Sequence, residues 1–93
     1  MSKALVHYES LFGQFLSGMM PVEEFQATFL ERFKNEEQLD GVAFNVLDQL
    51  FGDVDSFTAD QRLLAENPDF YLDEAKLREK VRSAADRLAA LKT

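Results

Sequence analysis

The chain has 93 residues, 46% of them hydrophobic and nine of them phenylalanine, which suits one domain spanning residues 1–93 with a small core. Cysteine is absent, which excludes disulfides, thiolate chemistry and cysteine-based metal sites. The formal net charge of −7 at pH 7 argues against nucleic acid or an anionic membrane as a direct ligand, because phosphate binding needs basic surface.

The first ten residues, MSKALVHYES, contain no apolar stretch of the kind that a signal peptide needs. No apolar run in the chain approaches the length of a membrane span. Together with the absence of cysteine, these features lead us to expect a cytoplasmic protein.

Two amphipathic segments begin the chain. Helical spacing of apolar residues predicts a first helix from about Lys3 to Ser17, ended by Gly18, because glycine adopts the left-handed conformation without steric cost. A second helix is predicted to start at Pro21 and to fade near Asn35. The apolar faces of these helices are expected to hold Leu5, Tyr8, Phe12, Phe15 and Leu16, and Val22, Phe25, Phe29 and Phe33.

Two further amphipathic segments follow. A third helix is predicted to open at Asp40, a good N-cap residue, and Gly52 is expected to end or bend it. The last helix is predicted to follow Asp73 as its N-cap, with Leu72 placed to pack on Leu77 across the first turn. The apolar faces are expected to hold Ala43, Leu47, Leu50, Phe51 and Val54, and Leu77, Val81, Ala84, Leu88 and Leu91.

The stretch between the third and last helices contains a turn at residues 67–69, and residues 57–64 are suited to a further short helix. No segment alternates with a period of two, so no strand is predicted. Short connections favour antiparallel neighbours. The predicted fold is therefore all-α, an antiparallel four-helix bundle with room for a short extra helix between helices three and four.

Nearly all the net charge lies in residues 53–74, which hold seven acids against Arg62 and so contribute −6 of the total −7. Phe57, Phe70 and Tyr71 lie among these acids, and a basic last helix follows directly. A charge run is ordinarily a solvated face. The segregated charge and embedded aromatics favour instead a surface that meets a basic partner, with Tyr71, beside the turn, as the better anchor. We expect Phe57 in the core.

Patterns that would carry chemistry are weak. The Asp53-x-Asp55 pair does not open an EF-hand loop, because Thr58 stands where that loop needs glycine and Leu64 where it needs glutamate. The one histidine has no serine or cysteine arrangement to serve, and no two carboxylates stand at a recognisable catalytic spacing. We therefore expect no enzyme activity, no catalytic residue, no metal site and no cofactor.

One tripeptide keeps a second function open. Asp55-Ser56-Phe57 is close to the Asp-Ser-Leu of acyl carrier proteins, which are also small, acidic and helical and carry phosphopantetheine on that serine. Here the serine follows three helical segments instead of one, and a serine in this position is more often a helix cap.

Three segments resemble a known family, the colicin D-type immunity proteins, which include relatives paired with contact-dependent growth inhibition toxins. They are LFGQFLSGMMPVEEF at 11–25, LDQLFGDVDSF at 47–57 and YLDEAKLREKVR at 71–82. The resemblance implies a four-helix antiparallel bundle without a catalytic role. It also implies binding to the nuclease domain of a cognate toxin, typically one that cuts tRNA, with acidic side chains occupying the places of RNA phosphates in its basic cleft.

The resemblance also implies roles for individual residues. Asp48 and Asp55 match acids around the family's Leu-Phe motif, whereas Leu50, Phe51 and Phe57 match its apolar positions. The acidic pair at 73–74 matches one before the last helix, where capping is the simpler role. Local charge adds Asp53 and Asp60, and aromatic content adds Tyr71; these three residues do not come from the family. The predicted toxin-binding residues are therefore Asp48, Asp53, Asp55, Asp60 and Tyr71.

The leading hypothesis is therefore a bacterial cytoplasmic immunity protein, a monomer that forms a one-to-one heterodimer with a basic toxin nuclease. Two alternatives from other classes stay open. One is a carrier protein modified on Ser56, and the other is a generic helical interaction or scaffold module, for example a homodimer through an apolar stripe.

Overall fold

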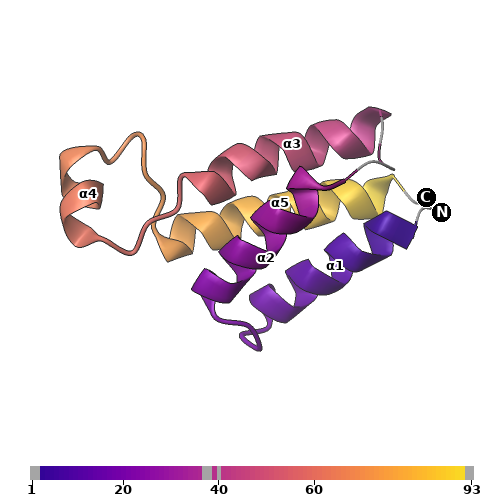
Figure 1. Cartoon of the computed structure of the whole chain (residues 1–93), viewed down its shortest axis with the longest axis horizontal. Coiled ribbons are helices and arrows are strands. Elements are labelled where there is room, and N and C mark those ends of the chain that lie inside the picture. Colours follow the sequence, from indigo (N-terminus) through magenta and orange to yellow (C-terminus); the bar gives the residue numbers. More distant parts are fainter. Residues whose placement is uncertain (1–2, 37–38, 40, 92–93) are drawn as a thin grey trace.

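The computed structural model describes residues 3–36, 39 and 41–91, and this described part of the chain forms five helices (Figure 1). No strand occurs among these described residues, so the all-α expectation is confirmed. The helices are α1 (Lys3–Leu16), α2 (Val22–Lys34), α3 (Gly41–Asp55), α4 (Gln61–Glu66) and α5 (Glu74–Ala90).

The four longer helices pack side by side as a helical bundle. α3 contacts both α5 and α2, and α1 contacts both α5 and α2, so each longer helix has two neighbours. The short helix α4 belongs to none of these extensive pairs, and Figure 1 shows it beyond the ends of α3 and α5. This arrangement gives an elongated molecule measuring 42 × 25 × 23 Å.

The first turn of the chain forms as predicted. Gly18 has a φ of +85°, and its N–H donates to the Phe15 carbonyl. The N–H of Met19 reaches the Gln14 carbonyl, which completes the two-bond Schellman termination of a helix. Pro21 lies one residue before α2, as its N-cap, because its ψ of 152° is still extended.

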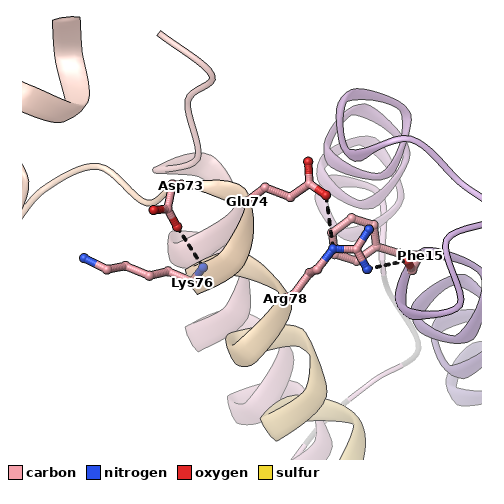
Figure 2. Close-up of polar contacts among 5 residues, drawn as sticks. All are labelled: Phe15, Asp73, Glu74, Lys76 and Arg78. Atoms are coloured by element: carbon pink, nitrogen blue, oxygen red, sulfur yellow. Dashed lines mark hydrogen bonds and ion pairs between the residues drawn. The ribbon is translucent and has the colours of Figure 1, made fainter. Parts of the chain in front are cut away.

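Helix α5 begins at the predicted cap. The Asp73 carboxylate accepts a hydrogen bond of 2.8 Å from the Lys76 N–H (Figure 2). Packing of Leu72 on Leu77 stays a prediction. The predicted cap of α3, Asp40, lies outside the described residues. Gly52 does not end α3, which continues to Asp55.

The core is formed by the apolar faces of the four longer helices and by Phe57, two residues after the end of α3. One prediction for these faces is wrong: Leu91 is 44% exposed, because α5 ends one residue before it. Leu11 and Val46 are buried as well, although they were not predicted to lie on these faces. The buried residues are Tyr8, Leu11, Phe12, Phe15, Val22, Phe25, Phe29, Val46, Leu47, Leu50, Val54, Phe57, Leu77, Val81, Ala84 and Leu88.

The predicted short helix exists, but it begins later than expected. Phe57 pairs with Leu72 in an isolated parallel β-bridge, so the chain is extended where the helix was expected to start. α4 then begins at Gln61, after Asp60. None of the helices in the described part of the chain is both long and apolar enough to cross a membrane.

Candidate functional site

Two of the predicted binding residues share one exposed side of α3. Asp48 and Asp55 are both exposed and lie seven residues apart, close to two helical turns. Phe51, half-buried, lies between them in the same row, and Phe44, 37% exposed, lies one turn before Asp48. We call this row of alternating aromatic and acidic residues, Phe44, Asp48, Phe51 and Asp55, the α3 stripe.

The aromatic members of the α3 stripe rest on a neighbouring helix. The Phe33 ring of α2 lies 5.4 Å, between ring centroids, from both Phe44 and Phe51. Phe33 in turn stacks on the buried Phe29 ring at 6.0 Å and 4°. A continuous series of ring contacts therefore joins the α3 stripe to the core. These contacts anchor the side of α3 that carries Asp48 and Asp55.

Asp53 points to a different part of the molecule. It is two residues from Asp55, about 200° around a helix, so the two carboxylates leave α3 on nearly opposite sides. Asp53 is half-buried and lines a groove of about 130 Å³ between α3 and α5, together with Lys80 and Arg87. Asp53 therefore faces the basic last helix.

Asp60 and Tyr71 belong to the segment that carries α4. One carboxylate oxygen of Asp60 accepts hydrogen bonds from the N–H groups of Arg62 (2.8 Å) and Leu63 (3.4 Å), which caps α4. Tyr71 is half-buried, whereas its neighbour Phe70 is 64% exposed. The five predicted residues thus fall into three places: the α3 stripe, the α3–α5 groove and the α4 segment.

The sequence did not lead us to predict the exposed aromatic residues Phe44 and Phe70 as part of this surface. Helical spacing does place Phe44 and Phe51 on the same side of a helix as Asp48 and Asp55, since the four residues recur every three or four positions. The opposite direction of Asp53 was readable in the same way. No comparable signal separates Phe70 from its neighbour, because their exposure depends on the conformation of the preceding turn.

The surroundings of Ser56 do not suit a carrier serine. It directly follows the last residue of α3, and its N–H donates to the carbonyls of Gly52 and Asp53. A serine of the carrier type precedes a helix, where the positive end of the helix dipole favours a phosphate group. Ser56 lies instead at the negative end of α3, which disfavours an attached phosphodiester.

Among the described residues, no three histidines, aspartates or glutamates lie close enough together to hold a metal ion. The candidate site is a contact surface, composed of carboxylates beside partly exposed aromatic rings. Such a surface recognises a partner with cationic and apolar groups.

Comparison with known proteins identifies the family. No curated protein and no solved structure matches the chain. The model of one family, described as bacterial self-protective colicin-like immunity, matches residues 3–88 and so extends from α1 almost to the end of α5. The chain therefore belongs to the colicin-like immunity family, whose members bind and neutralise a toxin.

Proposed function

We propose that the toxin neutralised by this chain is a nuclease of the colicin D type, one that cleaves tRNA, and that contact-dependent inhibition toxins are among the sources of such a domain. The immunity protein acts without catalysis, as a single domain in the bacterial cytoplasm. It binds one toxin molecule, and its four longer helices form the antiparallel bundle that the family resemblance implies.

The observation that carries the proposal is the pair of exposed carboxylates in the α3 stripe. At a rise of about 1.5 Å per residue, Asp48 and Asp55 lie roughly 10 Å apart along the helix axis. A nuclease cleft carries several basic side chains that bind the phosphates of its substrate. Two carboxylates on one rigid helix side can each meet a separate cation of that cleft, where phosphates would otherwise lie.

The aromatic half of the stripe supports the same proposal. Phe44 and Phe51 supply apolar area beside the carboxylates, and Phe33 supports both rings from α2. Apolar contact around a charged pair excludes water, which strengthens charge-assisted hydrogen bonds from arginine or lysine and slows dissociation. The carboxylates also accelerate encounter with a basic partner at low salt.

The remaining predicted residues take lesser roles in the proposed interface. Asp60 uses one oxygen to cap α4, which leaves the other for a partner cation. Tyr71 contributes a half-buried ring beside that segment. Asp53 is the weakest member, because Lys80 and Arg87 line the same groove and compete with any cation of the toxin.

The first test is toxicity and rescue. The C-terminal domain of the large protein encoded immediately upstream is expressed with and without this chain, and growth and tRNA integrity are followed. We expect growth arrest with cleaved tRNA, rescued by co-expression of the chain. If co-expression restores growth but the cells arrested without the chain still contain intact tRNA, the tRNase assignment is overturned. If co-expression does not restore growth, the pairing of toxin and chain is overturned.

The second test concerns the α3 stripe. The double variant Asp48→Lys/Asp55→Lys is expected to bind the same toxin domain at least about 100-fold more weakly, since each buried charge contact is worth about 2 kcal/mol or more. The matched control is Glu79→Lys/Asp86→Lys, two exposed acids on α5 with the same seven-residue spacing and the same change in net charge. Equal weakening in both variants would mean that only overall charge matters.

A further inference from the structure

The chain between α3 and α5 forms a closed projection. Its two ends are joined where the Thr58 N–H donates to the Leu72 carbonyl and the Leu72 N–H donates to the Ser56 carbonyl, both at 3.0 Å. The Gln26 side-chain amide of α2 donates to the carbonyls of Val54 (3.1 Å) and Phe57 (3.4 Å). We call residues 58–71, which lie between these closing contacts, the projection.

The projection does not contribute to the core. Its helix α4 has no buried residue, and the apolar residues that pack against the core come from elsewhere in the described chain. Figure 1 shows the projection extending away from the four longer helices, at the end where α3 stops and α5 starts. A segment anchored at its base but absent from the core has an outward-facing surface free to contact another molecule.

Phe70 is the apolar side chain that this projection presents. It is 64% exposed, whereas four of the nine phenylalanines are fully or almost fully buried at 0–1%. The N–H groups of Phe70 and Tyr71 both donate to the Asn67 carbonyl at 3.1 Å, and the Tyr71 ring meets the Phe70 ring edge-on at 4.8 Å. Backbone hydrogen bonds and one ring contact thus hold Phe70 in an exposed position, so little ordering remains to be done on binding.

The charge around Phe70 indicates the chemistry of its partner. The projection carries Asp60, Glu66 and Asp69 against Arg62, a net charge of −2. An exposed aromatic ring within an acidic segment complements an apolar pocket with lysine or arginine at its rim. The nuclease toxin proposed above has the required basic surface, so this inference rests on that proposal.

We infer that the projection is a second contact element for the toxin, separate from the α3 stripe, in which Phe70 fills an apolar pocket bordered by basic residues. Aromatic side chains in such pockets account for a large part of binding energy at protein interfaces. The stripe meets the charge that a nuclease cleft carries, whereas the projection adds an apolar contact through Phe70.

Affinity measurements with the purified upstream toxin domain test the contact. Phe70→Ala is expected to weaken binding about 30-fold or more, the loss typical of an aromatic anchor. Leu91→Ala is the control, because Leu91 is 44% exposed and directly follows α5. The C-terminal end of α5 lies at the opposite end of the bundle from α4 (Figure 1). Leu91→Ala is expected to bind within about twofold of the unchanged chain. Circular dichroism verifies that both variants keep their helices.

A spectroscopic measurement tests burial of the side chain itself. The chain has no tryptophan, so Phe70→Trp introduces a single reporter that keeps an aromatic ring at this position. Its fluorescence emission is expected to shift to shorter wavelength when the toxin domain is added. The emission spectrum of the complex formed by the unchanged chain is subtracted as background. A loss of affinity in Phe70→Ala without this shift would overturn the direct contact.

The remaining outcomes separate the two proposals. If the stripe variant Asp48→Lys/Asp55→Lys loses affinity while Phe70→Ala binds as the unchanged chain does, the second contact element is refuted and the proposed function stands. If the unchanged chain does not bind the toxin domain at all, the proposed pairing fails and the inference about Phe70 fails with it.

Discussion

Arg78 of α5 contacts Phe15 of α1 in two ways. Its guanidinium lies 4.5 Å from the centroid of the Phe15 ring and also donates a hydrogen bond of 3.0 Å to the Phe15 carbonyl oxygen (Figure 2). Glu74 accepts a further bond of 3.1 Å from the same guanidinium, and the Phe25 ring of α2 stacks on Phe15 at 4.3 Å. One cation thus joins α5 to the end of α1, where the helix dipole is negative.

Replacing this guanidinium is expected to destabilise the bundle. Arg78→Met keeps much of the side-chain stem but loses the cation–π contact and the bond to the carbonyl, which together contribute about 2 kcal/mol. The measurement is chemical denaturation followed by circular dichroism. Arg82→Met, an exposed residue one turn further along α5, is the control and should stay within about 0.5 kcal/mol. Equal destabilisation by the two variants would contradict a special role for Arg78.

Tyr8 makes the free energy of unfolding of the chain depend on pH in the alkaline range. Its ring is buried, and its hydroxyl donates a hydrogen bond of 3.0 Å to a Glu36 carboxylate oxygen. Burial, and then the bond to Glu36 and the negative charge of that residue, raise the pKa of Tyr8 well above its ordinary value. Above about pH 10 the unfolded chain releases this proton while the folded chain keeps it. The free energy of unfolding therefore falls as pH rises, by up to about 1.4 kcal/mol per unit.

Tyr8→Phe separates this effect from other titrations. At neutral pH the variant is expected to lose about 1 kcal/mol, the contribution of the hydrogen bond. Between pH 9 and pH 11 the difference should shrink or reverse, because the unchanged chain alone carries the titrating hydroxyl at position 8. Denaturation curves at several pH values give the comparison, and parallel pH dependence in the two proteins would show that Tyr8 does not contribute.

Two glycines in α1 and its terminating turn are expected to respond in opposite directions to the same substitution. Gly18→Ala forces a Cβ atom into a backbone with φ of +85°, which costs about 1 kcal/mol. Gly13→Ala lies within the helix, where a Cβ atom meets no neighbour, and should stabilise by about 0.5 to 1 kcal/mol. Thermal unfolding measures both. Equal signs for the two changes would contradict the described helix end.

Gln26 is expected to control how firmly the projection is held. Gln26→Ala removes the donors to the carbonyls of Val54 and Phe57 and should cost about 1 kcal/mol. Hydrogen exchange of the Thr58 and Leu72 amides, which form the closing bonds, should accelerate. Gln14→Ala on the exposed side of α1 is the matched control. Unchanged exchange at both amides would mean that the bridge holds without Gln26.

Much of the fold follows from local patterns. Apolar spacing identified the buried faces of the four longer helices, and Gly18 and Asp73 marked two of their ends by well-understood backbone chemistry. The bridge between Phe57 and Leu72 was not predictable in this way. It joins positions fifteen residues apart and involves single residues, too few to produce an alternating pattern.

The candidate site was predicted less completely than the fold. Asp48 and Asp55, predicted to bind the toxin, are exposed on one side of α3, but grouping Asp53 with them ignored the period of the helix that carries all three. The capping bond of Asp60 and the difference in exposure between Phe70 and Tyr71 depend on turns whose geometry composition does not determine. Whether these residues contact a toxin remains a prediction.

The closed base of the projection has an evolutionary consequence. Because Ser56, Thr58 and Leu72 tie its two ends together, residues between them can change in length or composition while the core stays intact. The entropic cost of lengthening such a loop grows slowly, by about 0.6 kcal/mol for each doubling. A lineage that exchanges one toxin for another can therefore acquire a new recognition segment by recombination at this point, and inherit the rest of its immunity protein unaltered.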